Sequence, residues 1–262
     1  MRSYPRAADR AVTPRSLLAH RFVSVCFLTA IVASLSSTAV TQDPLEGFPN
    51  NYKMILDNAK VSVIGVHYGP HERVGLHDHS EFPTLYVYLS DCGPVRFEHK
   101  EIPPFTQIRP AVKRGAFLYS PGRLERHTVE NLSDQSSDFL RIELKQLRVN
   151  AGTAFRGKAP AALAGNSAKK EFISPQLDVE RFVCMPGQLC LIPRSESSTL
   201  LIAFDDIRIQ GSASAAEPVQ MHANEVRYFS DSNAMNLSAT SQAPAHLLRV
   251  TLKLPPHVTS IP

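Results

Sequence analysis

Short segments rich in β-branched, leucine and aromatic residues follow one another from residue 45 onward, and no long pattern of helical period interrupts them. Such residues favour strands, and the 20 prolines and 12 glycines of the chain supply turns between them. A first set of segments lies at Val61–Tyr68, Leu85–Leu89, Val95–His99, Ala116–Ser120 and Phe139–Leu144. A second set lies at Val179–Cys184, Gln188–Ile192, Leu200–Phe204, Ile207–Ile209, Val226–Phe229 and Leu247–Leu252. This pattern predicts an all-β fold.

The two sets of segments resemble each other in sequence. FPTLYVYLSD at 82–91 resembles ESSTLLIAFDD at 196–206, and RGAFLYS at 114–120 resembles ANEVRYFS at 223–230. ENLSDQSSDFLRIELK, which ends at Lys145, resembles MNLSATSQAPAHLLRVTLK, which ends at Lys253. The shared order indicates an internal duplication with a period of about 110 residues. We therefore expect two small barrels, at 46–148 and 171–256, joined by a linker at 149–170 that is rich in Ala, Gly and Lys.

The first 41 residues are typical of a targeting segment. An arginine-bearing stretch ends at Arg21, an apolar run of fourteen residues follows from Phe22 to Leu35, and small residues come next. This order predicts a secretory signal cleaved near residues 39–41. The mature protein is then periplasmic or secreted, with no membrane attachment. An uncleaved anchor and a mitochondrial-type presequence are the other interpretations of the same pattern.

The formal charge of +4 resides entirely in this segment. Residues 1–41 contain five arginines and one aspartate, so the rest of the chain has 23 basic and 23 acidic side chains. A neutral mature chain without Lys/Arg runs gives no basis for expecting a nucleic-acid partner.

Three cysteines remain after residue 41. Cys184 and Cys190 flank a Pro186–Gly187 turn, which we interpret as a hairpin, and Cys92 lies apart from them. A disulfide across that turn and a pair of buried thiols are the two alternatives.

Histidines in the first unit form a constellation with metal-binding character. His77, His79 and Glu81 are spaced by two, so an extended strand would point all three side chains to one face. His127 follows about fifty residues later, after a Pro-Gly turn that could bring it back to the same point. Two or three imidazoles with a carboxylate suit a divalent Fe, Mn, Ni, Cu or Zn ion.

The arrangement resembles the two sequence motifs of the cupin superfamily. The first motif is matched by His77, His79 and the closing Gly93. The second motif is matched by Gly115, Pro121, Gly122, His127 and Asn131. The spacing from Gly115 to Pro121 and the spacing from His127 to Asn131 are those of the family. The resemblance implies two tandem double-stranded β-helix, or jelly-roll, barrels. It also implies that the three histidines bind the metal.

The chain departs from the family pattern in its carboxylate and in its second unit. The position of the family's glutamate falls on Pro83 or Thr84, so Glu81 comes too early in the sequence to match it. Glu81 remains a candidate ligand only because it would lie on the same face of an extended strand as His77 and His79. Alignment of the two units places Pro193 and Ser195 where His77 and His79 stand. We therefore expect a metal site in the first barrel alone. Asn131 and Asn236 match the N-glycosylation pattern and are interpreted as turn residues.

These observations predict an exported bicupin-like protein that binds a metal and a small molecule in its first barrel. Thr84, Tyr86 and Tyr88 share one face of their strand, where they either line the ligand cavity or pack in the core. Dioxygenase and isomerase chemistry are both compatible with an open metal position. The alternative is a non-catalytic binding or scaffold protein, because the fold alone does not determine activity. A homodimer is also left open.

Overall fold

The computed structural model describes residues 42–147, 154–211, 218–231 and 233–253. The expected signal segment, residues 1–41, lies outside these described residues. None of the helices in the described ranges has the length and hydropathy needed to cross a membrane. The first element is a short helix, α1 (Pro44–Gly47), capped by the side chain of Asp43.

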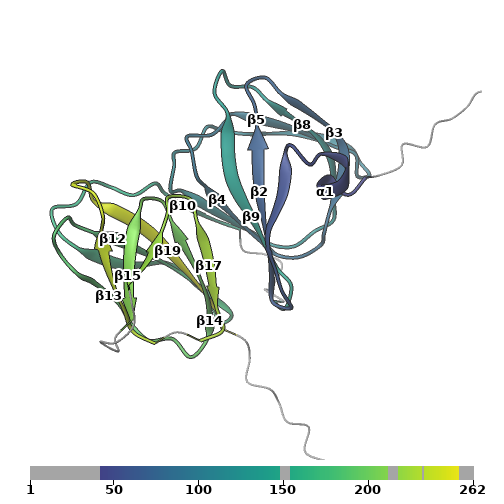
Figure 1. Ribbon diagram of the computed structural model, residues 1–262. Coiled ribbons are helices and arrows are strands. Elements are labelled where there is room, and N and C mark those ends of the chain that lie inside the picture. Colours follow the sequence, from purple (N-terminus) through teal and green to yellow (C-terminus); the bar gives the residue numbers. More distant parts are fainter. Residues whose placement is uncertain (1–41, 148–153, 212–217, 232, 254–262) are drawn as a thin grey trace, which may run out of the picture. The chain divides into compact units, whose positions relative to one another are not determined.

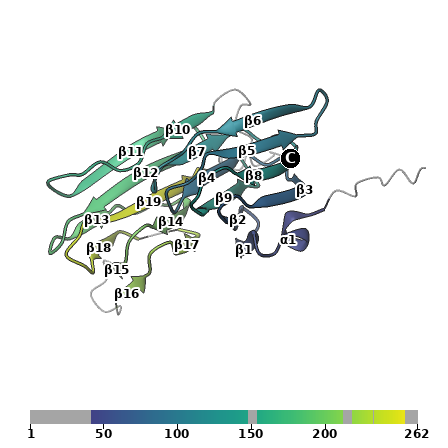
Figure 2. The same ribbon diagram turned by 90° about the horizontal axis from the view of Figure 1, so that it is seen from above.

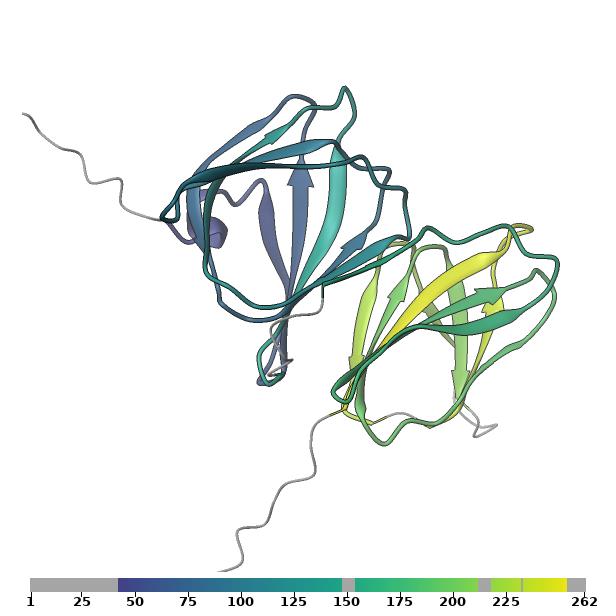
Figure 3. The same cartoon turned by 180° about the vertical axis from the view of Figure 1, so that it is seen from behind.

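The first barrel is built from two antiparallel sheets that curl around a common interior (Figures 1 and 3). Its larger sheet has the order β1-β2-β9-β4-β7-β10. These strands are β1 (Tyr52–Asp57), β2 (Val61–Tyr68), β9 (Ser137–Leu144), β4 (Thr84–Tyr88), β7 (Phe117–Ser120) and β10 (Phe155–Gly157). The smaller sheet has the order β3-β8-β5-β6. Its strands are β3 (Arg73–His79), β8 (Glu125–Asn131), β5 (Val95–His99) and β6 (Phe105–Arg109).

The second barrel has the same plan, and Figure 2 shows part of its larger sheet as neighbouring strands β11, β12 and β19. That sheet has the order β11-β12-β19-β14-β17. Its strands are β11 (Ser167–Ile173), β12 (Leu177–Cys184), β19 (Ala245–Leu252), β14 (Ser198–Ala203) and β17 (Val226–Phe229). The smaller sheet, β13-β18-β15-β16, is formed by β13 (Cys190–Ile192), β18 (Met235–Ala239), β15 (Ile207–Gly211) and β16 (Val219–Met221).

The two barrels are a strand-for-strand duplication. Adding ten to each strand number from β1 to β9 converts the order of both sheets of the first barrel into that of the second. Even an irregularity is repeated, because the pairing register shifts between Met54 and Leu56 in β1 and between Lys170 and Phe172 in β11. The all-β fold with two tandem barrels, predicted from the sequence, is confirmed.

Buried side chains form three clusters. One lies inside the first barrel and includes Tyr52, Tyr86 and Phe97. Another lies inside the second barrel and includes Ile192 and Met235. The third combines outward-facing residues of both larger sheets. Its fully buried members include Val63, Leu85, Leu140, Leu177, Leu200 and Val250.

Residues 149–170, the expected linker, contain regular structure where the chain is described. Strand β10 extends the larger sheet of the first barrel by pairing with β7, and β11 begins at Ser167. Part of the range, residues 149–153, lies outside the described residues.

Cys184 and Cys190 form a disulfide with a Cα–Cα distance of 5.6 Å, which selects one of the two alternatives. The connection is not the hairpin that the Pro-Gly turn suggested. Strands β12 and β13 belong to different sheets, so the bridge links one sheet of the second barrel to the other. Gly187 lies in the turn with φ +70°, a conformation that favours glycine.

Candidate metal centre

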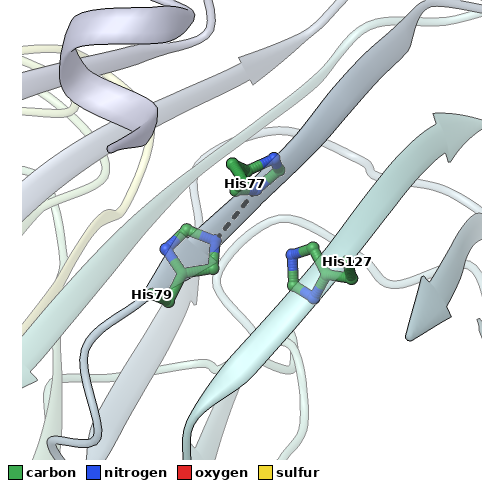
Figure 4. A group of neighbouring side chains, drawn as sticks. All are labelled: His77, His79 and His127. Atoms are coloured by element: carbon green, nitrogen blue, oxygen red, sulfur yellow. Dashed lines mark hydrogen bonds between the residues drawn. The ribbon is translucent and has the colours of Figure 1, made fainter. Parts of the chain in front are cut away.

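Strands β3 and β8 position the three histidines (Figure 4). His77 and His79 alternate along β3, so both side chains point to the barrel interior. Strand β8 is the antiparallel neighbour of β3, and His127 is the direct partner of His77 across that pair. The ligand atoms of the three residues all lie within 4.8 Å of one another.

The three rings meet edge to face in a buried position. Their relative exposures are 0% for His77, 7% for His79 and 2% for His127. The Nε2 atoms of His77 and His79 are 3.1 Å apart. The ring of His127 is centred 4.9 Å from that of His77 and 5.1 Å from that of His79.

Hydrogen bonding determines which nitrogen of His77 is available to a ligand. Its Nδ1–H donates to the Gly75 carbonyl at 2.8 Å, so Nε2 carries the lone pair and faces the other histidines. His127 is in a different situation, because neither of its ring nitrogens has a hydrogen-bond partner although both are buried. A buried polar atom without a partner is costly, and a bound water or ion is one group that would satisfy it.

Burial holds the imidazoles in their neutral form. It lowers the pKa of His77 below its ordinary value and those of His79 and His127 well below it. The positive charge of Arg141 lowers the pKa of His77 and His79 further. A neutral imidazole is the form that binds metal ions, so the surroundings prepare these side chains as ligands.

Glu81 is not brought into this group. Strand β3 ends at His79, and Glu81 is exposed in the bend that follows. The parity argument for Glu81 required the strand to continue for two more residues. Of the three candidate pocket residues, Tyr86 lines the interior cavity. Thr84 is buried with its hydroxyl donating to the Phe82 carbonyl, and Tyr88 packs against Phe139.

A buried carboxylate is nevertheless present, at Glu125 on β8. Glu125 lies two residues before His127 on the same strand, so both side chains face inward. Its Oε2 accepts a hydrogen bond from Nη1 of Arg141, on β9, at 3.2 Å. Arg141 also contacts Glu143 at 3.0 Å and the Tyr86 hydroxyl at 2.7 Å. Burial acts to raise the pKa of Glu125, but the guanidinium groups of Arg141 and Arg109 outweigh it and lower the pKa to about 2. The side chain is therefore an ion.

Two further groups beside the histidines were not predicted from the sequence. The Tyr52 hydroxyl lies 2.9 Å from His77 Nε2 and 2.8 Å from the Tyr68 hydroxyl. His99, the partner of His127 on β5, is also buried, with its ring centred 5.1 Å from that of His127. His99 could have been identified as an inward residue, because it lies on the same face of its strand as Val95 and Phe97. No pattern in the sequence around Tyr52 indicates that its side chain reaches the histidines.

The space enclosed by these residues is small. A cavity of about 10 Å³, counted as the volume open to the centre of a water molecule, lies among them. This is room for about one water or ion. Its walls are Tyr52, Val66, Tyr68, His79, Tyr86, Phe97, Arg109, His127, Phe139 and Arg141.

The second barrel carries aliphatic residues at the equivalent positions. Ile192 pairs with Met235 between β13 and β18, as His77 pairs with His127 between β3 and β8. In the next pair of strands, Gly211 of β15 lies opposite Met235 of β18, just as His99 of β5 lies opposite His127 of β8. Gly211 is therefore the equivalent of His99, and Met235 that of His127. The sequence alignment with Pro193 and Ser195 was thus displaced, because the pairing register aligns His77 with Ile192. Among the described residues, this three-histidine group is the one set of three or more His, Cys, Asp or Glu side chains arranged to hold a metal.

The two duplicated antiparallel barrels, of which the first has inward histidines on β3 and β8, have the tandem cupin fold. Solved bicupins share this architecture. The S161A variant of Bacillus subtilis oxalate decarboxylase matches with a TM-score of 0.53 and 12% identity over 77% of this chain and 72% of that chain. AerE from Microcystis aeruginosa matches with a TM-score of 0.52 and 10% identity over 77% of this chain and 97% of that one.

Salicylate 1,2-dioxygenase from Pseudoaminobacter salicylatoxidans matches with a TM-score of 0.50 and 12% identity, over 75% of this chain and 70% of that chain. Another structure of the B. subtilis decarboxylase is described by its Mn(II) centres and has a TM-score of 0.51. The sequence matches no family model and no curated protein. At these identities the likeness shows the fold.

Proposed function

We propose that the protein binds a divalent metal ion in its first barrel through His77, His79 and His127. The observation that carries this proposal is the state of His127, whose two buried ring nitrogens have no partner at the point where two other neutral imidazoles converge. A cation would accept the one nitrogen lone pair of the neutral His127 ring, which has no donor among the described residues of the protein. Imidazole ligands favour Zn, Cu, Fe or Ni, and the Mn(II) centres of the B. subtilis decarboxylase occur in the same fold.

The separation of the His77 and His79 donor atoms fits a single ion. Two nitrogens bound at right angles to one metal at about 2.1 Å lie about 3 Å apart. The Nε2 atoms of His77 and His79 are separated by 3.1 Å. The Gly75 carbonyl holds His77 in the required tautomer, which is the usual function of an outer hydrogen-bond acceptor at a metal site.

For the bound ion we propose enzymatic chemistry of dioxygenase or isomerase type. An ion held by three imidazoles would supply Lewis acidity through its remaining positions. The chain's own residues supply the surroundings: Tyr86 and Phe97 line the cavity, and the guanidinium of Arg109 lies over both rings, at 4.6 and 4.3 Å. Its positive charge favours an anionic guest.

The size of the cavity favours a second candidate, a metal-binding protein without catalysis. Room for about one water does not admit an organic substrate beside the histidines. A catalytic function therefore requires side chains such as Arg109 to move, whereas a scaffold or metal-binding function does not.

The test of metal binding is metal content. We expect the untagged protein, purified after growth in metal-replete medium, to contain about one equivalent of a first-row metal by mass spectrometry. His77→Ala, His79→Ala and His127→Ala should each reduce this content at least tenfold, because each removes one of three ligands. His67→Ala is the matched control, since His67 is a half-exposed histidine of the same barrel.

Each variant is checked for folding by circular dichroism. A folded wild-type protein with little metal would exclude the proposed function. Equal metal content in the wild type and in all three variants would exclude this site while leaving metal binding elsewhere.

We also propose that the protein is exported. The charged, apolar and small-residue pattern of residues 1–41 supports this, and so does the Cys184–Cys190 disulfide, because disulfides persist in oxidising compartments. The native protein should begin near residues 40–42 by N-terminal sequencing, with Cys184 and Cys190 bridged in peptide maps. A soluble cytoplasmic protein that begins at Met1 would contradict export.

A further inference from the structure

Tyr52 places a phenol oxygen directly at the histidine group. It lies at the start of β1, on the larger sheet, and its side chain is 2% exposed. Its oxygen is 2.9 Å from Nε2 of His77, the nitrogen that faces the other two histidines. Its ring centre is 5.2 Å from that of His77 and 5.7 Å from that of His79.

The hydrogen bonds around Tyr52 have one consistent direction. Because His77 donates through Nδ1 to the Gly75 carbonyl, its Nε2 accepts, and the Tyr52 hydroxyl is the donor. The Tyr52 oxygen then accepts from the Tyr68 hydroxyl at 2.8 Å. The lone pair that receives the Tyr52 proton is the one that the proposed metal would take.

We propose that the Tyr52 oxygen is the fourth protein ligand of the metal centre. This inference rests on the proposed function, since it concerns the same ion. Ligand atoms in adjacent positions of one ion lie about 3 Å apart. The Tyr52 oxygen lies 2.9 Å from His77 Nε2, and the His79 Nε2 lies 3.1 Å from it. Both distances are those expected between ligand atoms in adjacent positions of one ion.

Burial raises the pKa of Tyr52, so the side chain is neutral here, and as a phenolate bound to the ion it would supply the anionic ligand that the three histidines lack. Glu81 is exposed, and Glu125 is already paired with Arg141. When the ion binds, the O–H bond of Tyr52 breaks, its proton passes to solvent, and the electron pair on oxygen is donated to the metal. The Tyr68 hydroxyl remains a donor to the resulting phenolate, and a hydrogen bond to a charged acceptor is stronger than one to a neutral acceptor.

A ferric phenolate has a visible charge-transfer absorption, which makes the ligand directly observable. The metal-free protein is loaded with Fe(II) under argon and then oxidised, and its iron content and visible spectrum are measured. We expect the coloured band in the wild type and its loss in Tyr52→Phe. Tyr68→Phe should keep the band at a shifted wavelength, because it removes only the hydrogen bond to the ligand oxygen.

Tyr86→Phe is the matched control within the same cavity. Its hydroxyl is occupied by Arg141 at 2.7 Å and Glu125 at 3.3 Å, so its removal should leave the band unchanged. A second measurement does not depend on colour. Titration calorimetry of Zn²⁺ binding in buffers of different ionisation enthalpy should show about one proton fewer released by Tyr52→Phe than by the wild type.

The outcomes separate this inference from the proposed function. Iron bound to the wild type without a band, or an equal band and equal proton release in Tyr52→Phe, overturns Tyr52 as a ligand and leaves the histidine site intact. Loss of the band in Tyr86→Phe alone also overturns it. A wild type that binds neither Fe nor Zn overturns the proposed function, and this inference with it.

Discussion

Three charged residues inside the first barrel are paired, because Arg141 forms ion pairs with both Glu125 and Glu143. Arg141, 3% exposed, lies between Glu125 and Glu143, which are 4% and 7% exposed. Burying such ions costs several kcal/mol each unless they are paired. The pairing keeps Glu125 ionised beside the histidines and engages its carboxylate with Arg141.

The depressed pKa of Glu125 predicts how its contribution to stability depends on pH. The folded-state pKa is about 2 and the ordinary value is 4.5, so the contribution is present above about pH 4.5 and is lost as pH falls toward 2. A difference of this size corresponds to roughly 3 kcal/mol. Glu125→Gln should therefore lower the free energy of unfolding at pH 7, and the difference from the wild type should shrink between pH 4.5 and 2.

Urea unfolding at a series of pH values measures this difference. Glu98→Gln on the neighbouring strand β5 is the control, because the Glu98 side chain is half exposed and its pair with Lys100 is on the surface. A difference between wild type and Glu125→Gln that is constant from pH 7 to 3 would contradict the assignment.

At the residue scale, strand parity and spacing predicted the convergence of His77, His79 and His127, because those signals are local. Glu125 has the same parity relation to His127, but the family pattern directed attention to residues after His79. Tyr52 and Arg141 could not have been predicted in this way. Their positions depend on how β1 and β9 pair within the larger sheet and on which of their residues then face inward.

At the element scale, strands buried on both faces were easiest to predict. Every residue of β14 is buried, and its sequence STLLIA contains the apolar run Leu200–Ala203. Strand β12 is also buried throughout although it contains Asp178, Glu180 and Arg181, and its apolar residues at 179 and 182–184 carried the prediction. Strands β1, β6 and β11 were missed, because most of their residues are exposed and carry no alternating pattern. Strand β6 is the edge of its sheet, where pairing on one side alone maintains the strand.

Register is the property that sequence comparison predicted least well. The similarity of ENLS at 130–133 to MNLS at 235–238 suggested that Asn131 and Asn236 are equivalent. Pairing with β5 and β15 instead aligns Asn131 with Ala239. Asn131 is fully buried, and its amide donates to the carbonyls of Tyr68, Gly69 and Gln135, so it fastens two loops together. The interpretation of Asn131 and Asn236 as turn residues is wrong, because Asn131 is the last residue of β8 and Asn236 lies within β18.

At the scale of the whole molecule, the cluster shared by the larger sheets predicts that the two barrels depend on each other for stability. Leu200 and Leu201 are adjacent on β14 and both are 0% exposed, but Leu200 belongs to the shared cluster and Leu201 to the interior of the second barrel. Replacing either leucine by alanine should lower the free energy of unfolding by about 2–5 kcal/mol. Their effects on the first barrel should differ.

Tyrosine signals can report this difference. The chain has no tryptophan, and five of its seven tyrosines lie in the first barrel, at positions 52, 68, 86, 88 and 119. In near-ultraviolet circular dichroism, Leu200→Ala should lower the denaturation midpoint of the tyrosine signal more than Leu201→Ala does. A tyrosine midpoint unchanged by Leu200→Ala would show that the barrels unfold independently.

The duplication also gives this chain an internal reference for any measurement on the first barrel. Both barrels are made in the same cell, share one backbone plan and experience the same solvent, yet one carries His77 opposite His127 and the other Ile192 opposite Met235. A property found in one barrel and absent in the other is therefore due to the side chains in which the barrels differ rather than to the backbone plan. Placing the three histidines at the equivalent positions of the second barrel would test, within a single molecule, whether the shared backbone plan is sufficient for them to bind a metal.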